Sequence, residues 1–279
     1  MIKLLLTLLL LVVGQNAWAT NWCADANTVL GAKMEETSST YTDCSSSANN
    51  GTVNGAMTRT GTPKYGTNAL DDNQVNNAYV DFGSAASLDN ITALTVCAWV
   101  AADTDGGNSG SLCNAASIIG KNDNSDGWNL CFQTTGQIRF RVRFSGSGTV
   151  NWTTTDTPFA SYDGTYHHVC ATYNNSSTSN DPVIYFDGVS RTITESTAPV
   201  GTYNTDASSS VKLGIENTAS NEGEFDGRMD EIFISNKVLN STEIADLRDC
   251  GLDGTNCASS RKKLMTLDGK KKKKYSYHY

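Results

Sequence analysis

After its first twenty residues the chain lacks any apolar run that approaches the roughly 20 residues a transmembrane helix needs. The early apolar run, Leu4 to Val13, follows Lys3 and precedes the small-x-small motif Ala17-Trp18-Ala19. This order is typical of a secretory signal peptide over residues 1–19, with the mature chain starting near Thr20. The sequence therefore predicts a secreted or extracytoplasmic protein, in a periplasm or at a cell surface, without a transmembrane segment.

The chain also lacks any C-x-x-C pair, which argues against a zinc site as the role of its eight cysteines. His167 and His168 are adjacent, so in a strand they point to opposite faces and do not easily chelate one metal. An even number of cysteines in an exported chain indicates disulfides instead. Spacing alone does not fix the connectivity. We predict the pairs Cys97 with Cys170 and Cys113 with Cys131, and a tie between the two chain ends made by Cys23, Cys44, Cys250 and Cys257.

Basic residues are scarce in the body of the chain. From Thr20 to Ser260 there are 12 Lys and Arg against 28 Asp and Glu, a net charge of −16. Phosphate binding needs a basic face, so this balance argues against a nucleic-acid partner and suits cations, calcium above all. The last segment, residues 258–279, is basic and without periodicity, and we predict a disordered tail there.

What the chain has in abundance is Gly, Ser, Thr and Asn, together with about a dozen short runs of alternating apolar and polar residues. Such runs, separated by polar turns, predict an all-β fold: a two-sheet antiparallel β-sandwich of the jelly-roll type. Asp187-Gly188 predicts a type I′ hairpin turn, and residues 38–55 and 101–117 are predicted loops. One short C-terminal helix, residues 241–248, is predicted from the capping-box pair Asn240 and Glu243. The strand-like runs are 27–34, 77–83, 93–102, 117–121, 127–134, 137–144, 149–154, 166–174, 182–188, 189–194, 211–216 and 230–235.

Several of these runs, in order, resemble a known family. They are SSSANNGTVNG with KYGTNAL, NNAYVDFG, LTVCAWV, YHHVCATY, PVIYFDG, and VKLGIE followed by GEFDGRMDEIFISNKVLNSTEI. Together they cover about residues 27 to 247 and resemble a LamG-like jelly-roll domain of the concanavalin A-like lectin/glucanase superfamily, related to laminin G modules and pentraxins. One departure is Tyr166, where the family usually has Trp. The resemblance implies one LamG-like domain over residues 20–257.

The resemblance also implies a calcium site, because the pentraxin-like pattern places ligands just before one strand and just after another. In this chain those positions are Asn76, Asn77, Glu216 and Asn217. Only one of them is charged, so the expected site is weak, and ordinary turn residues explain the same pattern equally well. Calcium is accordingly the one cofactor we expect.

Catalysis is the alternative that the same superfamily suggests. Its glucanases carry carboxylates at alternating strand positions, so that a nucleophile and an acid/base group face one cleft. Glu224 and Asp226 begin such a pattern, but Met229 interrupts it and Gly227 breaks the strand. The loop from Asn122 to Gly127 imitates the start of an EF-hand, yet a strand-like run follows it. We therefore predict a protein that is not an enzyme, and we reject the EF-hand while leaving a loop metal open.

Two features could bind a ligand. Arg139, Arg141 and Arg143 alternate with apolar residues, so their guanidinium groups line one strand face and match carboxylates or sulfates. A solvated outer face explains the same row. Trp128 follows a loop and is the candidate for stacking on a sugar, whereas Trp99 fits the core and Trp152 fits either role.

The sequence thus predicts a secreted, non-catalytic binding module for carbohydrate or for an extracellular protein surface, with calcium assisting at the binding edge. A secreted glycoside hydrolase or lyase on the same scaffold is one alternative. A surface adhesion or structural protein is the other.

Overall fold

The computed structural model of the protein describes residues 19–73, 78–106, 113, 115–123, 125–216 and 223–257. All but the last residue of the predicted signal peptide, and the whole predicted tail, lie outside these ranges. The elements are η1 (Trp22–Ala24), β1 (Thr28–Ala32), β2 (Thr40–Tyr41), β3 (Gly51–Asn54), β4 (Thr58–Thr60), β5 (Ala69–Asn73), β6 (Tyr79–Gly83), β7 (Ala93–Ala102), β8 (Ser117–Lys121), β9 (Trp128–Phe132), β10 (Ile138–Phe144), β11 (Gly148–Thr154), β12 (His167–Asn174), β13 (Val183–Phe186), β14 (Val189–Ser190), β15 (Ile193–Glu195), β16 (Val211–Leu213), β17 (Asp226–Ser235) and α1 (Ser241–Cys250).

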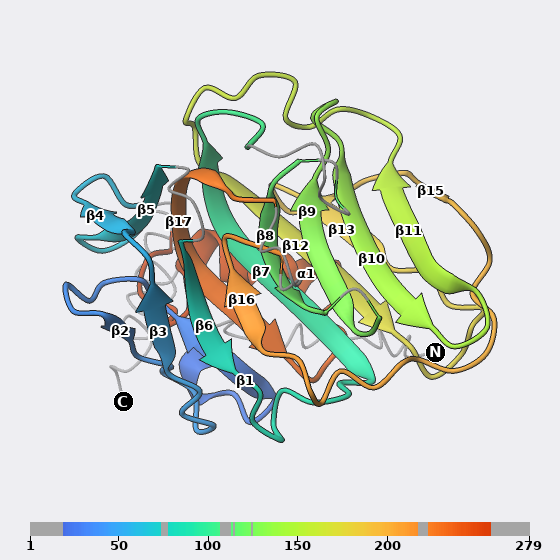
Figure 1. The fold of residues 1–279 in the computed structure, drawn as a ribbon. Coiled ribbons are helices and arrows are strands. Elements are labelled where there is room, and N and C mark those ends of the chain that lie inside the picture. The colour runs from blue at the N-terminus through green and yellow to red at the C-terminus, as the bar shows by residue number, and fades with distance from the viewer. Residues whose placement is uncertain are drawn as a thin grey trace, which may run out of the picture.

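These strands form two antiparallel sheets that lie face to face (Figure 1), which confirms the predicted β-sandwich. The first sheet has eight strands in the order β14-β13-β12-β7-β17-β5-β4, with β1 paired to β17. The second has nine strands in the order β15-β11-β10-β9-β8-β16-β6-β3-β2. Runs such as β8 to β11 and β12 to β14 are consecutive in sequence, whereas pairs such as β7 with β17 join strands that are distant in sequence.

The core lies between the sheets and follows from strand alternation. In β10 the side chains of Ile138, Phe140, Val142 and Phe144 are all buried in this core. A strand directs successive side chains to opposite faces, so the arginines between them lie on the outer face of the nine-stranded sheet. Alternation in the sequence therefore sets which face of this sheet meets the core.

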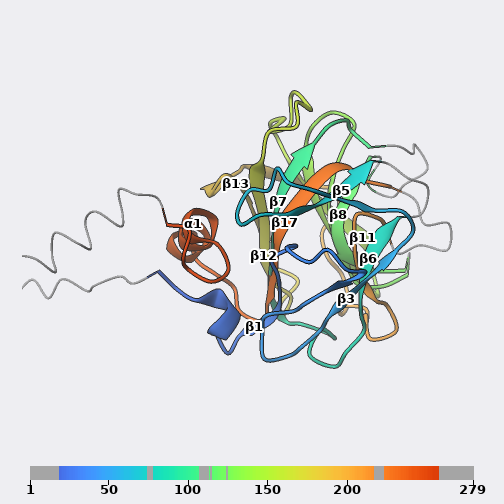
Figure 2. The same cartoon turned by 90° about the vertical axis from the view of Figure 1, so that its left-hand side faces the viewer.

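The outer face of the eight-stranded sheet is covered by α1 and the N-terminal segment (Figure 2). A second apolar cluster forms there, in which Trp22, Phe233 and Leu247 pack around the Cys97–Cys170 disulfide. The helix begins with the predicted capping box, since Asn240 accepts from the amide of Glu243 and the Glu243 carboxylate accepts from the amide of Asn240. The chain's own two ends therefore occupy the outer face of this sheet.

Two of the predicted disulfides are confirmed, Cys97 with Cys170 and Cys113 with Cys131. The predicted tie between the chain ends is wrong, because Cys23 bonds Cys44 and Cys250 bonds Cys257. Each of these two bridges closes a short loop within its own end of the chain, of 21 and 7 residues in sequence separation.

The two ends nevertheless meet through other contacts. The amide of Cys23 donates to the carbonyl of Leu252 at 3.1 Å. The amide of Thr20 donates to the Asp246 carboxylate at 2.9 Å. Hydrogen bonds and packing, rather than a disulfide, join the ends.

Several short strands escaped the sequence-based prediction. The segment 38–55, predicted as a loop, contains β2 and β3, and neither β4 nor β5 was anticipated. The Asp187-Gly188 turn does have the positive φ angles of 51° and 76° that a type I′ hairpin needs.

In the described ranges, no helix combines the length and the apolar character required to span a bilayer.

Candidate functional site

Three adjacent strands of the nine-stranded sheet, β9, β10 and β11, build a polar surface on its outer face. Arg141 of β10 lies directly across from Asn129 of β9 and from Asn151 of β11 in the strand register. Val150 and Trp152, on either side of Asn151, point into the core, so Asn151 shares the outer face with Arg141. We call Arg141, Asn129 and Asn151 the central polar triad.

Arg141 is buried despite its outward direction, with only 6% of its surface exposed. The structure places Glu216 beside it, with 3.9 Å between Arg141 Nη1 and Glu216 Oε1. Burial lowers the pKa of Arg141 to about 10, so the guanidinium stays charged at neutral pH. The solvated outer face that would have explained the arginine row does not describe this residue.

The central polar triad contains polar atoms with unused hydrogen-bonding capacity. Among the described residues, Nε and Nη1 of Arg141 and Oδ1 of Asn151 are buried and have no hydrogen-bond partner. Asn129, by contrast, donates to Ser117 Oγ at 3.0 Å and to Asn122 Oδ1 at 3.3 Å. Donors and an acceptor therefore stand unused side by side on one sheet face.

The other two arginines of the row have different surroundings. Arg139 is half-buried and its Nε donates to Thr153 Oγ1 at 3.3 Å, while burial lowers its pKa. Arg143 is half-buried and its Nη1 donates to Thr149 Oγ1. The row is thus held in place by threonines of the neighbouring strand β11.

A small, partly open surface pocket adjoins this row, and its volume of about 210 Å³ includes the open solvent at its mouth. It is lined by Asn122, Asp126, Gly127, Trp128, Asn129, Arg141, Val142, Arg143 and Thr149. Trp128 is only 3% exposed, so it does not present the open ring face that sugar stacking needs. Trp152 is fully buried in the core and its indole N–H donates to Asp181 at 3.0 Å.

The predicted calcium ligands are only partly described. Asn76, Asn77 and Asn217 lie outside the described residues. Glu216 is fully buried, and its Oε1 accepts from the amide of Cys113 at 2.8 Å in addition to facing Arg141. Its carboxylate therefore already balances the positive charge of Arg141.

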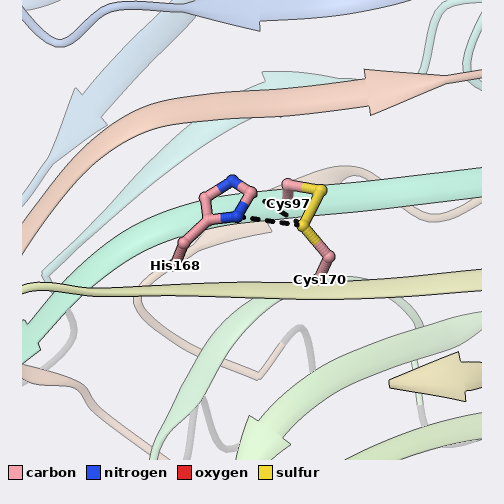
Figure 3. A group of neighbouring side chains, drawn as sticks. All are labelled: Cys97, His168 and Cys170. Atoms are coloured by element: carbon pink, nitrogen blue, oxygen red, sulfur yellow. Dashed lines mark hydrogen bonds between the residues drawn. A yellow bond between two sulfur atoms is a disulfide. The ribbon is translucent and has the colours of Figure 1, made fainter. Parts of the chain in front are cut away.

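One group of metal-type side chains gathers elsewhere, on the eight-stranded sheet (Figure 3). In the described part of the chain, Cys97, His168 and Cys170 are the one set of three such residues with closely spaced ligand atoms. Cys97 and Cys170 are joined as a disulfide, so they offer no thiolate. Burial lowers the pKa of His168 to about 3, and its neutral ring packs 3.6 Å from the sulfur of Cys170. This group is a structural packing element.

The residues considered for catalysis and for a loop metal have structural partners. Asp226 accepts a hydrogen bond from the hydroxyl of Thr104 at 2.7 Å. Gly227 has a φ of 133°, and a Cβ there would lie 2.1 Å from the Ala101 carbonyl oxygen. Asp126 accepts from Ser209 Oγ at 3.0 Å, and the strand β9 follows its loop as expected. The expectation that Gly227 breaks the strand is wrong, because Gly227 lies within β17; the carboxylate pattern is interrupted by Met229, which is buried in the core.

The sequence-based prediction did not include Asn151 among the candidate binding residues. The signal was present, because Asn151 lies between Val150 and Trp152, and these alternate as one face of a strand. Its contact with Arg141 depends on the pairing of β10 with β11 through the turn at 145–147. A hairpin reading of residues 137–154 would have found the pair.

Comparisons with known proteins agree with this architecture. The sequence pattern of the concanavalin A-like lectin/glucanases superfamily matches residues 71–245. No curated protein matches the chain.

Solved structures with a similar fold include two binding domains and one domain of an enzyme. The binding domain of Paraclostridial Mosquitocidal Protein 1 has 17% identity and a TM-score of 0.61, over 80% of this chain and 52% of that one. The binding domain of Botulinum neurotoxin DC, in complex with rat synaptotagmin II, has 12% identity and a TM-score of 0.56, over 80% and 51%. Domain 4 of AbnA, a GH43 extracellular arabinanase from Geobacillus stearothermophilus in complex with arabinotriose, has 16% identity and a TM-score of 0.54, over 81% and 100%.

This chain spans about half the length of the two toxin domains. At these identities the solved structures establish a shared fold. The match to the family covers more than half of the sequence. The chain therefore belongs to the concanavalin A-like lectin/glucanases superfamily.

Proposed function

We propose that this protein is a secreted, non-catalytic carbohydrate-binding module whose ligand lies on the outer face of the nine-stranded sheet, over the central polar triad. The observation that carries the proposal is the pair of neighbouring side chains, Arg141 and Asn151, with buried donors and a buried acceptor that no described group satisfies. An unpaired buried polar group costs about 1–3 kcal/mol, which a ligand that pairs with it recovers.

Sugars suit this arrangement because each hydroxyl both donates and accepts. Arg141 offers N–H donors, and the Asn151 carbonyl offers an acceptor on the adjacent strand. Opposed residues on neighbouring antiparallel strands lie about 5 Å apart, a spacing that one sugar ring can bridge. Threonine hydroxyls of β11, at Thr149 and Thr153, extend the same polar face. AbnA Domain 4, a similar structure, was solved with arabinotriose.

The cysteines support the exported location. Four disulfides join the eight cysteines, and such bonds persist in oxidising compartments. The absence of a catalytic role rests on the partners of Asp226 and on the close approach at Gly227. Both features give the acidic run around β17 a structural role.

Binding to an oligosaccharide panel tests the proposal. We expect at least one oligosaccharide to bind the full-length secreted chain, and Asn151→Ala to weaken that binding at least tenfold. Ser241→Ala, at an exposed position of α1 on the opposite side, serves as the matched control and keeps the wild-type affinity. If no oligosaccharide binds, or if Asn151→Ala binds as well as the control, the proposal is refuted and a protein ligand becomes the better explanation.

Calcium stays a separate proposal. We propose that any calcium site uses Asn76, Asn77 and Asn217, because the Arg141 guanidinium beside Glu216 repels a divalent cation there. A ligand that binds only the folded state raises the melting temperature. The melting temperature with millimolar calcium, compared with a chelator, checks this: an equal value under both conditions contradicts a calcium site.

A further inference from the structure

Positively charged side chains line the pocket beside Arg143, and binding of a neutral sugar does not require their charge. Three arginines stand in one row on β10, about 6–7 Å apart along the strand. Glu216 is the carboxylate that forms an ion pair with this row in the described part of the chain. The row is therefore positively charged in a body whose net charge is −16.

The ion pair with Glu216 leaves the hydrogen-bond donors of Arg141 unused. At 3.9 Å, the distance from Nη1 to the Glu216 carboxylate exceeds a hydrogen bond, so the carboxylate balances the charge of Arg141 without accepting the Nη1–H. Nε and Nη1 of Arg141 have no hydrogen-bond partner among the described residues. The Nε–H and Nη1–H bonds point in different directions, so each can donate to a separate acceptor, and the oxygens of a carboxylate or a sulfate are strong acceptors for charged donors.

A second guanidinium, that of Arg143, lines the same pocket as Arg141. Arg141 and Arg143 both line it, together with Asn129 and Thr149. Arg143 is half-buried, and Nη1 is the atom that bonds Thr149. The one carboxylate of the pocket wall, Asp126, accepts hydrogen bonds from Ser209 and from the amide of Asp123. Burial raises the pKa of Asp126.

We propose that this pocket binds the anionic group of an acidic saccharide, either the carboxylate of a uronic acid or a sulfate ester, and that Arg141 and Arg143 hold it. The inference rests on the proposed carbohydrate function and adds the class of sugar. Neutral parts of the same chain lie over Asn151 and the threonines of β11. The anionic group enters from the pocket side, where Arg143 is the more accessible guanidinium.

Calorimetric titration of the full-length protein with three probes tests this: an oligogalacturonate, its carboxyl-reduced neutral counterpart, and a sulfated galactan oligosaccharide. We expect one or both acidic probes to bind at least tenfold more tightly than the neutral probe, with an affinity that falls as salt rises. Preference for the first probe assigns a uronate, and preference for the last assigns a sulfate.

Two substitutions with the same charge change separate the pocket from the rest of the surface. Arg143→Gln should remove the preference, so that the acidic probes bind no more tightly than the neutral probe. Arg191→Gln removes a half-buried arginine that pairs with Asp156, and it should keep the preference. If Arg143→Gln lowers the melting temperature, Arg143→Lys replaces it as the test. Lysine retains the positive charge but lacks the planar pair of N–H donors, so this variant should keep part of the preference for the acidic probes.

The outcomes distinguish the two proposals. Equal affinity for all three probes, or the same loss in both glutamine variants, overturns the anionic pocket and leaves carbohydrate binding standing. Failure of every probe and of the wider panel overturns both.

Discussion

The buried ammonium of Lys121 gives the sharpest prediction about stability. Its side chain is fully buried at the end of β8, and Nζ lies 3.0 Å from the Asp89 carboxylate and 3.0 Å from Ser84 Oγ. It also donates to the carbonyl of Ser209. One ammonium thus joins the loop between β6 and β7 to the segment before β16.

Lys121→Met keeps the apolar stem and removes the charge. Breaking a buried ion pair costs about 3–5 kcal/mol, and the partial exposure of Asp89, whose side chain is 19% exposed, favours the lower end. A loss of about 3 kcal/mol corresponds to a fall in melting temperature of roughly 6–12 °C for a domain of this size. Lys33→Met is the matched control, because its ion pair with Asp253 is about one-third exposed and contributes about 0–1 kcal/mol.

Urea denaturation at neutral pH under oxidising conditions measures both variants. The double variant Lys121→Met with Asp89→Asn should lose less than the sum of the single losses, because it removes both partners. If Lys121→Met and Lys33→Met lose the same free energy of unfolding, the buried ammonium does not hold these loops together.

Two further predictions concern β17. Burial raises the pKa of Asp230 to about 8 and that of the adjacent Glu231 to about 7, so the free energy of unfolding should fall as pH rises from 6.5 to 8, by at most about 1.4 kcal/mol per pH unit for each group. Asp230→Asn should flatten this slope whatever its absolute stability, and an unchanged slope in chemical denaturation would speak against the raised pKa. Gly227→Ala should destabilise by about 3 kcal/mol or more, because its Cβ meets the Ala101 carbonyl oxygen, whereas Gly148→Ala, with φ of 72° and open space around it, should cost about 1–2 kcal/mol. Equal melting temperatures for the two glycine variants would contradict the close contact.

Much of the fold was predictable because its signals are local. The alternation of Ile138, Phe140, Val142 and Phe144 predicted both the strand and its buried face. Asn240 predicted the start of α1, which then runs two residues past the prediction and ends where Gly251 takes a φ of 71°. The short strands β2 and β4 have little alternation, and their pairing depends on partners elsewhere in the sheets.

The candidate site was less predictable because it depends on what lies next to each side chain. The sequence correctly placed the arginines on one strand face, but it carried no information that Glu216 and strand β11 would enclose Arg141. Trp128 was expected at the surface because it follows a loop. The structure buries it, since its partner in the register is the core residue Val142. Alternation along a strand determines the face of the sheet on which a side chain lies, whereas the burial of that side chain depends on the neighbouring strands.

The local closure of the terminal disulfides has a mechanical consequence. A pulling force applied at the two ends of the folded unit would pass through the bonds from Cys23 to Leu252 and from Thr20 to Asp246, because no disulfide spans the ends. These hydrogen bonds would bear the force before the strands beneath them do. The terminal layer would therefore peel away first under load, while the sheet that carries Arg141 keeps its shape.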